Sequence, residues 1–169
     1  EYMEAETSML RRVMFEEDGN GKHSPDSPRL LFLMMIDLDG FKLINDTFGH
    51  LAGDTALIEV KDRLIASCRK SDSIVRWGGD EFLIIGQART YEGAEIMAGK
   101  VRASLADPQY DLGDGRFGKL SASIGISPIP FVEGKLDFAT WEQVSNIADL
   151  GTYLAKSNGR DAWVSIAGT

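Results

Sequence analysis

The sequence predicts an α+β fold in which helices cover a central sheet on one or both faces. The chain has 169 residues, which suits one domain with a sizeable core, and 43% of them are hydrophobic. Helical and strand-like hydrophobic patterns follow one another in the order helix, strand, helix, helix, strand, strand, helix, strand, helix, strand. The chain contains no internal repeat. This order of elements indicates the α+β class.

The first stretch, residues 1–16, has a helical pattern. Its apolar stripe consists of Met9, Leu10, Val13 and Met14. Residues 17–28 are polar and rich in Gly, Pro and Ser, which predicts a loop. The chain begins at Glu1 rather than at a methionine, so we expect it to be a piece of a longer protein. The helix 1–16 would then connect the domain, residues 17–169, to an upstream sensor region.

The first strand is expected over residues 30–36, because a continuous apolar run of this length is typical of a strand buried on both faces. Asp37-Leu38-Asp39-Gly40 follows and places carboxylates at the edge of the sheet, where a cation can offset their charge. A short helix is expected next, as far as Asn45. A longer helix follows residues 49–54. Its apolar face consists of Leu57, Val60, Leu64 and Cys68.

A β-hairpin is predicted over residues 73–87. Two apolar runs flank Gly78-Gly79 there, and glycine reaches positive φ at little steric cost. Around residues 120–127, apolar residues alternate with serine and glycine, which is strand periodicity. The remaining elements are a helix over residues 91–106, a helix over residues 140–157 and a closing strand over residues 162–166.

The composition argues against several classes of function. The net charge is −8, which disfavours a nucleic-acid polymer as the main partner, although a small phosphorylated ligand can still be neutralised by magnesium and a few basic residues. Cys68 is the only cysteine, so the chain has no internal disulfide and suits a reducing compartment such as the cytoplasm. No apolar run approaches the roughly 20 residues that span a bilayer. We therefore expect no membrane insertion of this fragment, while attachment of the parent protein stays open.

Two acidic groups point to a site for a divalent cation. Asp80 and Glu81 directly follow the glycine pair of the hairpin, and Asp37 follows the first buried strand. Magnesium prefers oxygen ligands and typically uses one or two carboxylates together with substrate phosphates. For Asp37 and Asp80 we favour metal binding over turn chemistry. For Asp39 we favour a role as N-cap of the helix that follows.

Four further residues are candidates for ligand binding, and three of them have a second interpretation. Asn45 and Asp54 suit recognition of a base edge by an amide and a carboxylate, but Asp54 equally suits an N-cap at a helix start. Lys156 and Arg160 lie at the end of the last helix. There they either complement the helix C-terminus or clamp terminal phosphates. Spacing alone leaves these alternatives open.

Residues 76–82, Arg-Trp-Gly-Gly-Asp-Glu-Phe, resemble the signature of the GGDEF family, the diguanylate cyclases. Residues 37–46, Asp-Leu-Asp-Gly-Phe-Lys-Leu-Ile-Asn-Asp, resemble the first-strand motif of the family. Further blocks resemble the family in order and at its spacing. They are residues 48–54, 123–126 and 148–160. The similarity spans residues 30–166.

The resemblance implies a ferredoxin-like, polymerase-palm-like core with a mainly antiparallel sheet. It also implies an enzyme that condenses two GTP molecules into cyclic di-GMP and releases pyrophosphate. A 3′-hydroxyl would attack an α-phosphate across a homodimer that is at least transient. The implied cofactor is Mg²⁺, two ions per active site, with Mn²⁺ as an alternative.

Carried over by position, the resemblance implies a role for individual residues. Asp37, the backbone carbonyl of Leu38 and Asp80 would hold the metal ions. Asp80 and Glu81 would be catalytic, with Glu81 activating the 3′-hydroxyl. The residues implied in GTP binding are Phe41, Lys42, Asn45, Asp54, Gly78, Gly79, Lys156 and Arg160.

Residues 69–72, Arg-Lys-Ser-Asp, resemble the RxxD inhibitory motif of the family. The resemblance implies that Arg69 and Asp72 bind the product cyclic di-GMP and restrain the enzyme. The motif is short, and a solvated helix end explains the same residues.

A non-catalytic module that binds GTP or cyclic di-GMP is the alternative function. Such a module would be expected to show losses at Asp37, Asp80, Glu81 or Asp54, and all four acids are present. A cyclase for another nucleotide is disfavoured, because Asn45 is present together with Asp54.

Overall fold

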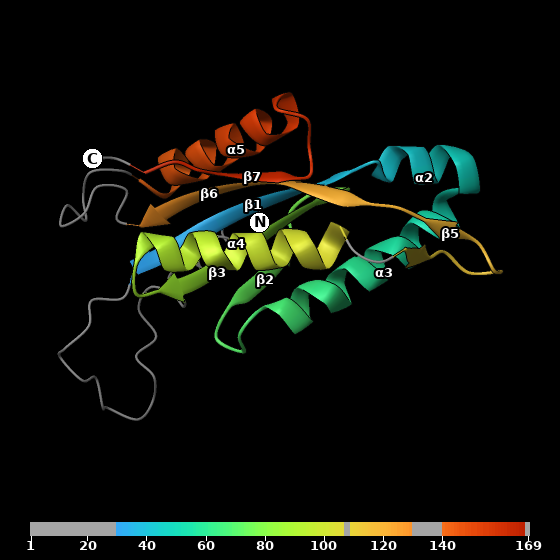
Figure 1. Ribbon diagram of the computed structural model, residues 1–169, viewed down its shortest axis with the longest axis horizontal. Helices are drawn as coiled ribbons and strands as arrows, with labels where there is room; N and C mark the ends of the chain where they lie inside the picture. Colours follow the sequence, from blue (N-terminus) through green and yellow to red (C-terminus); the bar gives the residue numbers. More distant parts are fainter. Residues whose placement is uncertain (1–29, 107–108, 130–139, 168–169) are drawn as a thin grey trace, which may run out of the picture.

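The computed structural model describes residues 30–106, 109–129 and 140–167 (Figure 1). The helix predicted over residues 1–16 and the loop predicted over residues 17–28 lie outside the described residues. In chain order the elements are β1 (Leu30–Asp39), α2 (Phe41–Phe48), α3 (His50–Ser67), β2 (Ser73–Arg76), β3 (Glu81–Ala88), α4 (Tyr91–Ala106), β4 (Tyr110–Asp111), β5 (Phe117–Gly118), β6 (Ser121–Ile129), α5 (Trp141–Ser157) and β7 (Ala162–Ser165). In the described part of the chain, no helix has both the length and the apolarity needed to cross a bilayer.

Five strands form one sheet in the order β2-β3-β1-β6-β7. The pairs β2–β3, β3–β1 and β1–β6 are antiparallel, and β7 runs parallel to β6. The central place of β1 explains its continuous apolar run, because a strand with a neighbour on each side and helices on both faces exposes little side chain. The predicted α+β fold with a mainly antiparallel sheet flanked by helices is confirmed.

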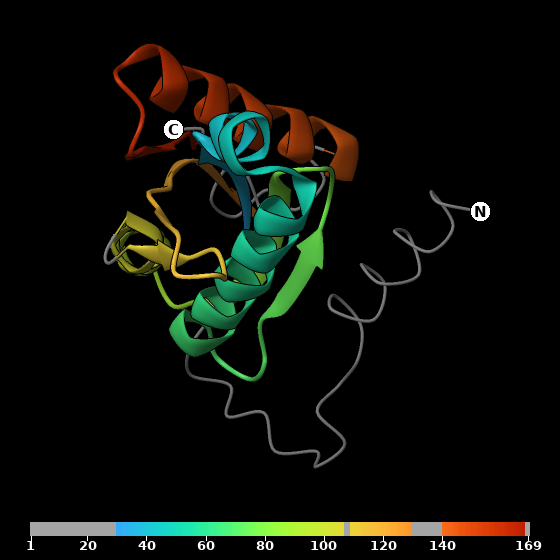
Figure 2. The same cartoon turned by 90° about the vertical axis from the view of Figure 1, so that its right-hand side faces the viewer.

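Helices α3 and α4 cover one face of the sheet and α5 covers the other (Figure 2). Alternate residues of β1 divide between the two apolar clusters. Met34 and Ile36 pack in the cluster that contains α3 and α4, whereas Leu33 and Met35 pack with α5. Because side chains alternate along a strand, Asp37 continues the face that α5 covers.

Helix α5 packs closely on β6 because two glycines leave room for its backbone. A Cβ atom on Gly125 would lie 1.8 Å from the carbonyl oxygen of Ala148, and one on Gly151 would lie 2.9 Å from the Cα of Gly125. Ser123, Gly125 and Ser127 of β6 are therefore as buried as the apolar residues between them. The helix begins in a capping box formed by Thr140 and Gln143.

Strand β1 runs three residues beyond its apolar run and includes the acids expected to follow it. Asp37 and Asp39 pair with Ser123 and Ser121 of β6, so β6 extends the ladder. The expected N-cap role of Asp39 is wrong. Gly40 occupies the N-cap of α2 at φ 85°, and no side chain caps the helix.

Helix α3 begins at His50, so Asp54 lies inside it. The N-cap interpretation of Asp54 is therefore wrong, and Gly49 occupies the N-cap. The side chain of Asp54 is exposed on this helix.

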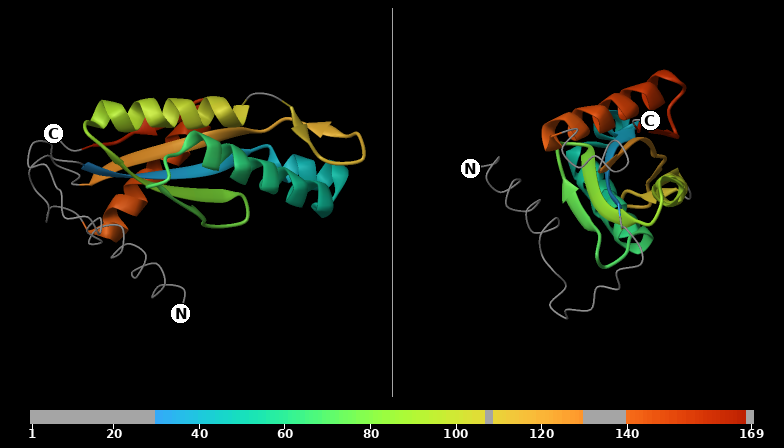
Figure 3. Two further views of the ribbon diagram at one scale, coloured as in Figure 1. Left: turned by 90° about the horizontal axis from the view of Figure 1, so that it is seen from below. Right: turned by 90° about the vertical axis from the view of Figure 1, so that its left-hand side faces the viewer.

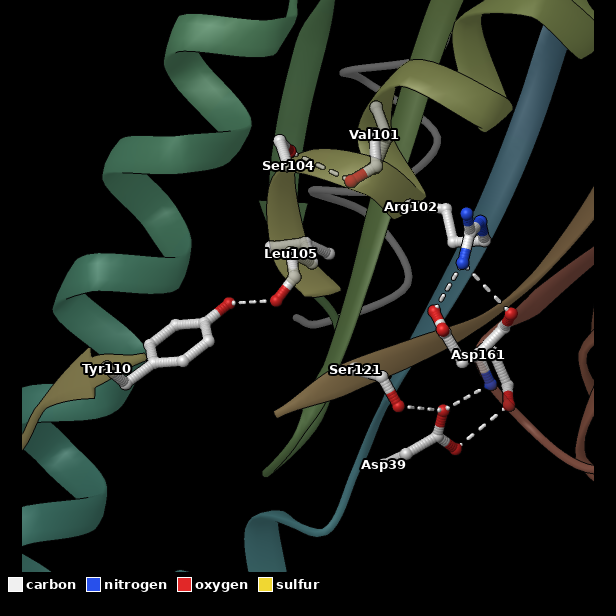
Figure 4. Close-up of polar contacts among 9 residues, drawn as sticks. Asp39, Val101, Arg102, Ser104, Leu105, Tyr110, Ser121 and Asp161 are labelled. Atoms are coloured by element: carbon white, nitrogen blue, oxygen red, sulfur yellow. Dashed lines mark hydrogen bonds and ion pairs between the residues drawn. The ribbon is translucent and has the colours of Figure 1, made fainter. Parts of the chain in front are cut away.

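The small hairpin β4–β5 was not predicted from the sequence. Its strands have two residues each, too few to show periodicity. It extends beyond the end of α4, on the side of the molecule where α2 and α3 lie (Figure 3). Tyr110 anchors it: this side chain is fully buried, and its hydroxyl donates a 2.8 Å hydrogen bond to the carbonyl oxygen of Leu105 (Figure 4).

Candidate active site

The acids of β1 and the glycine turn of the hairpin meet at one end of the sheet. Strands β1 and β3 are neighbours, and Asp37 is the register partner of Glu81. The N–H of Leu38 donates a 3.1 Å hydrogen bond to the carbonyl oxygen of Asp80. The structure therefore brings together the two acidic groups that the sequence placed far apart.

The turn that carries Asp80 is held by its own hydrogen bonds. The N–H groups of Trp77 and Gly78 donate to the carbonyl oxygen of Glu81, at 2.8 and 3.3 Å. The guanidinium of Arg76 donates to the carbonyl oxygens of Gly78 and Gly79, at 3.2 and 2.8 Å. These bonds fix the turn before any ligand arrives, which is the preorganisation a binding site needs.

The two glycines of this turn have different surroundings. A Cβ on Gly78 would lie 2.5 Å from Oε2 of Glu81, so a side chain there would displace the carboxylate. A Cβ on Gly79 would have nothing within 4 Å. Packing within the described residues therefore does not require a glycine at position 79. The missing side chain leaves open space next to Asp80.

The carboxylates of this site perturb one another. Burial raises the pKa of the Asp37 carboxyl; a hydrogen bond and the charge of Lys156 oppose that rise, and the charge of Asp80 adds to it. Burial also raises the pKa of Glu81, and the charges of Asp37 and Asp80 raise it further. Negative charge is thus concentrated here, and a bound cation would relieve the repulsion.

Helix α5 supplies the counter-charge. Lys156, in its last turn, donates a 2.5 Å hydrogen bond from Nζ to Oδ2 of Asp37. The close packing of α5 on β6 brings the end of the helix over the face of the sheet that bears Asp37. The interpretation of Lys156 as a partner of the helix C-terminus alone is therefore incomplete, because its ammonium contacts the predicted metal ligand.

The two residues predicted to read a base lie on adjacent helices. Asn45 is on α2, and Asp54 is on α3 next to Gly53. A Cβ on Gly53 would lie 2.0 Å from Oδ1 of Asn45, so the amide of Asn45 rests against the backbone of α3. The structure thus places this amide beside the helix turn that carries Asp54.

The two residues predicted to contact phosphates have opposite environments. The ring of Phe41 is buried at 8% exposure, so only its backbone remains for a ligand. Lys42 is exposed, and its ammonium lies 3.6 Å from the carboxylate of Asp46. This exposed pair leaves Lys42 free to turn toward an anion.

Asp39 holds a network that the sequence did not reveal. Its Oδ1 accepts a 2.9 Å hydrogen bond from the hydroxyl of Ser123. Its Oδ2 accepts 3.0 Å bonds from the hydroxyl of Ser121 and from the N–H of Asp161 (Figure 4). Arg160 lies near, with Nε 3.8 Å from Oδ1. The available signal was the pair of serines two residues apart on β6, opposite an acid on the neighbouring strand.

The RxxD residues lie away from the acidic site, at the other end of β2. The N–H of Arg69 donates a 2.8 Å bond to Oδ2 of Asp72, and the N–H of Asp72 donates back to the carbonyl oxygen of Arg69 at 3.0 Å. The guanidinium of Arg69 donates to the carbonyl oxygen of Gln87. Oδ1 of Asp72 is buried and has no hydrogen-bond partner among the described residues.

The oxygen atoms at the acidic site suit a hard cation that is also coordinated by a bound ligand. Within residues 30–106, 109–129 and 140–167, no three or more His, Cys, Asp and Glu side chains gather to hold a metal by themselves. The available donors are the carboxylates of Asp37 and Asp80 and the carbonyl of Leu38. Magnesium characteristically takes one or two carboxylates and completes its shell with water and substrate phosphates, so this donor set fits it.

Comparison with known proteins finds similar sequences and structures. The sequence matches the family described as "Diguanylate cyclase, GGDEF domain" over residues 5–162. It is 38% identical over 135 residues to the bifunctional diguanylate cyclase/cyclic di-GMP phosphodiesterase MucR of Pseudomonas aeruginosa. This match covers 80% of this chain and 19% of MucR. It is 35% identical over 139 residues to diguanylate cyclase A of Treponema denticola, covering 82% and 36%. The chain therefore spans well under half the length of these curated relatives.

The solved structures agree with the sequence comparison. The GGDEF domain of YfiN, also called TpbB, from Pseudomonas aeruginosa matches this fold with a TM-score of 0.74 at 32% identity. The match covers 83% of this chain and 84% of that domain. Sequence and structure thus point to the same group of proteins.

Proposed function

The chain belongs to the GGDEF-domain family of diguanylate cyclases, and on this premise we propose that it condenses two GTP molecules into cyclic di-GMP. In each of two steps, the 3′-oxygen of one nucleotide bonds to the α-phosphorus of the other, and the bond to pyrophosphate breaks. The observation that carries the proposal is the meeting of Asp37 and Asp80 beside Glu81, held by the hydrogen bond from Leu38 to Asp80. Each chain offers one such site, so two chains must face each other as a homodimer, at least transiently.

The residues that would hold the metal are Asp37, Asp80 and the carbonyl of Leu38. Two Mg²⁺ ions, with Mn²⁺ as the alternative, would stabilise charge on the phosphoryl oxygens and lower the pKa of the attacking hydroxyl. The protein's own part is to hold the two carboxylates at a fixed separation through the β1–β3 pairing. In-line phosphoryl transfer depends mainly on such positioning and on charge stabilisation.

Glu81 is the residue we propose to take the proton of the 3′-hydroxyl. It lies on β3 beside Asp37, and its carboxylate lies against the backbone of Gly78 in the glycine turn. Burial and the neighbouring acids raise its pKa, which makes its carboxylate a better proton acceptor.

Guanine recognition would fall to Asn45 and Asp54. An amide oxygen and a carboxylate together accept hydrogen bonds from the N–H groups of guanine, which adenine does not present in the same pattern. Gly53 lets the Asn45 amide rest against α3 beside Asp54.

The phosphates would be held by groups from two elements. The backbone of Phe41 and the ammonium of Lys42 act from the start of α2, where the helix N-terminus favours anions. Lys156 and Arg160 act from the end of α5 and the turn that follows. The bare backbone of Gly78 and Gly79 admits the nucleotide.

We also propose that Arg69 and Asp72 bind the product and restrain the enzyme. The turn that holds the two residues together supports the proposal: the N–H of Arg69 donates to Oδ2 of Asp72, and the N–H of Asp72 donates to the carbonyl oxygen of Arg69. Arg69→Ala is expected to weaken inhibition by cyclic di-GMP. An unchanged inhibition curve would contradict product binding by these residues and favour the alternative, a solvated helix end.

The activity is tested by incubating the protein with GTP and Mg²⁺ and separating the products by chromatography. We expect cyclic di-GMP and pyrophosphate from GTP and no corresponding product from ATP. Absence of cyclic di-GMP at high protein concentration would overturn the proposal and favour the non-catalytic binding module.

Two variants connect the activity to the site. Asp80→Asn removes one metal carboxylate and is expected to lower turnover by about a hundredfold or more. Asp62→Asn is the matched control, because Asp62 is an exposed acid on α3 whose carboxylate lies 3.1 Å from the ammonium of Lys61. Turnover that survives Asp80→Asn would contradict the metal role.

A further inference from the structure

We infer that Asp39 is a positioning residue that fixes the turn over residues 158–161 and thereby places Arg160 for the terminal phosphates of GTP. The inference rests on the proposed phosphate role of Arg160. Asp39 has no part in the proposed chemistry, although it lies on the same face of β1 as Asp37, two residues further along.

The carboxylate of Asp39 is fully engaged within the protein. It is 8% exposed and accepts hydrogen bonds from two serine hydroxyls of β6 and from the N–H of Asp161. Arg160 adds a cation 3.8 Å from Oδ1. Both oxygens of this carboxylate already accept hydrogen bonds within the protein, which leaves few lone pairs for a metal ion. The role of Asp39 therefore differs from that of Asp37.

The turn that Asp39 contacts has an unfavourable backbone. Gly159, Arg160 and Asp161 have φ values of 107°, 65° and 45°, so three successive residues are left-handed. Glycine adopts such values readily, but residues with a Cβ do so at an energetic cost. The surrounding structure must therefore hold Arg160 and Asp161 in place.

Two side chains from different elements hold Asp161. Arg102 of α4 donates to its carbonyl oxygen at 3.2 Å and to its Oδ1 at 2.7 Å (Figure 4). Asp39, on β1, accepts a 3.0 Å hydrogen bond from the N–H of Asp161. Of these two contacts, only that of Asp39 ties the turn to the strand that carries Asp37. Asp39 therefore sets the position of Arg160 relative to the metal carboxylate.

The test compares ligands with and without terminal phosphates. Binding to the Mg²⁺-loaded protein is measured for α,β-methylene GTP, which resists attack, and for GMP. Asp39→Ala should weaken binding of the analogue about tenfold, because a displaced Arg160 loses its charge-assisted contact with the terminal phosphates. It should leave GMP binding unchanged. Arg160→Ala should do the same, and the double variant should lose no more than either single one.

Asp39→Asn distinguishes the hydrogen bond that Asp39 accepts from Asp161 from the negative charge of its carboxylate. The amide oxygen of Asn can still accept the N–H of Asp161, so binding of the analogue should stay within about twofold of the parent. This variant also keeps the test informative if Asp39→Ala fails to fold. Ser127→Ala is the control, because Ser127 is a buried serine of β6 whose hydroxyl has no hydrogen-bond partner among the described residues.

The outcomes distinguish the two claims. If Arg160→Ala leaves binding of the analogue unchanged, the proposed phosphate role of Arg160 fails. If Arg160→Ala weakens it but Asp39→Ala does not, the positioning role of Asp39 is overturned. A loss in Asp39→Asn as large as that in Arg160→Ala would also overturn it, because the charge rather than the hydrogen bond would then matter.

Discussion

Charged side chains at the end of β1 and β3 oppose the stability of the ligand-free domain. Asp37, Asp80 and Glu81 are close enough for their charges to raise the pKa values of Asp37 and Glu81, and Lys156 offsets only part of this. Like charges held together destabilise a folded protein, and such strain is common where binding or catalysis requires it. A bound cation would therefore relieve the repulsion that these acids exert on one another.

Glu81→Gln should stabilise the ligand-free protein at neutral pH. Because the pKa of Glu81 is raised in the folded state, its favourable contribution is present at low pH and is lost as the pH rises through the folded pKa. The variant removes that loss, so the free energy of unfolding should rise at pH 7 and should show no gain at acidic pH. Urea unfolding at a series of pH values measures this. A variant less stable than the parent at pH 7 would contradict the repulsion.

Gly53→Ala should impair guanine selection without unfolding the protein. The new methyl would lie 2.0 Å from Oδ1 of Asn45 and would displace its amide, while alanine favours the helix by up to about 1 kcal/mol. We expect the preference for GTP over ATP to fall about tenfold in kcat/KM. Gly99→Ala in α4, where the nearest atom is at 3.6 Å, is the control and should change neither property. Undiminished discrimination by the Gly53 variant would remove the proposed role of Asn45.

Sequence patterns indicated the charged residues of the site but not all of their roles. Asp37 and Asp80 stood out because each follows an apolar run or a glycine turn. Asp39 was interpreted as an N-cap because its true partners, Ser121 and Ser123, lie 82 and 84 residues further along the chain. Local spacing cannot show a contact that only strand pairing creates.

At the scale of elements, the position of α5 on β6 decides whether Lys156 can reach Asp37. The contact depends on Gly125 and Gly151, which let two backbones approach. The helix, its apolar residues and its end were predictable from periodicity and from Asn158-Gly159. The glycine contact was not, because it joins two elements that the sequence separates.

Gly125→Ala should therefore affect both stability and activity. The added methyl would lie 1.8 Å from a backbone oxygen of α5, which cannot rotate away as a side chain can. We expect a loss of about 3 kcal/mol in the free energy of unfolding and lower turnover through displacement of Lys156. Gly86→Ala on β3 is the matched control: its methyl would meet the side-chain ring of Phe32 rather than backbone atoms of another element, so the loss should be smaller. Equal losses in the two variants, measured by urea unfolding, would contradict the close-packing argument.

Short elements and strand ends were the least predictable. The hairpin β4–β5 has strands of two residues, and its place is fixed by burial of the single aromatic side chain of Tyr110 rather than by a pattern. Strand β1 continued through Asp39 because β6 continued beside it. In both cases tertiary contacts, which a local pattern does not contain, set the boundary.

At the scale of the whole molecule, the proposed function makes one domain half of a reaction centre. Asp37, Asp80 and Glu81 form one acidic site on each chain. The order of elements and the α+β class followed from hydrophobic periodicity, and the five-stranded order with β1 at the centre is what brings these groups to one end. If the product is the proposed one, with two guanine nucleotides, its formation requires a second copy of the same surface.

The most direct test of this account is the initial rate of cyclic di-GMP formation from GTP and Mg²⁺ across a dilution series of the protein. While the protein is mostly monomeric, doubling its concentration should raise the rate about fourfold, because the active species forms by mass action between two chains. The same series with Asp80→Asn should give almost no product. A rate proportional to protein concentration down to the highest dilution, or no cyclic di-GMP at any concentration, would contradict the account.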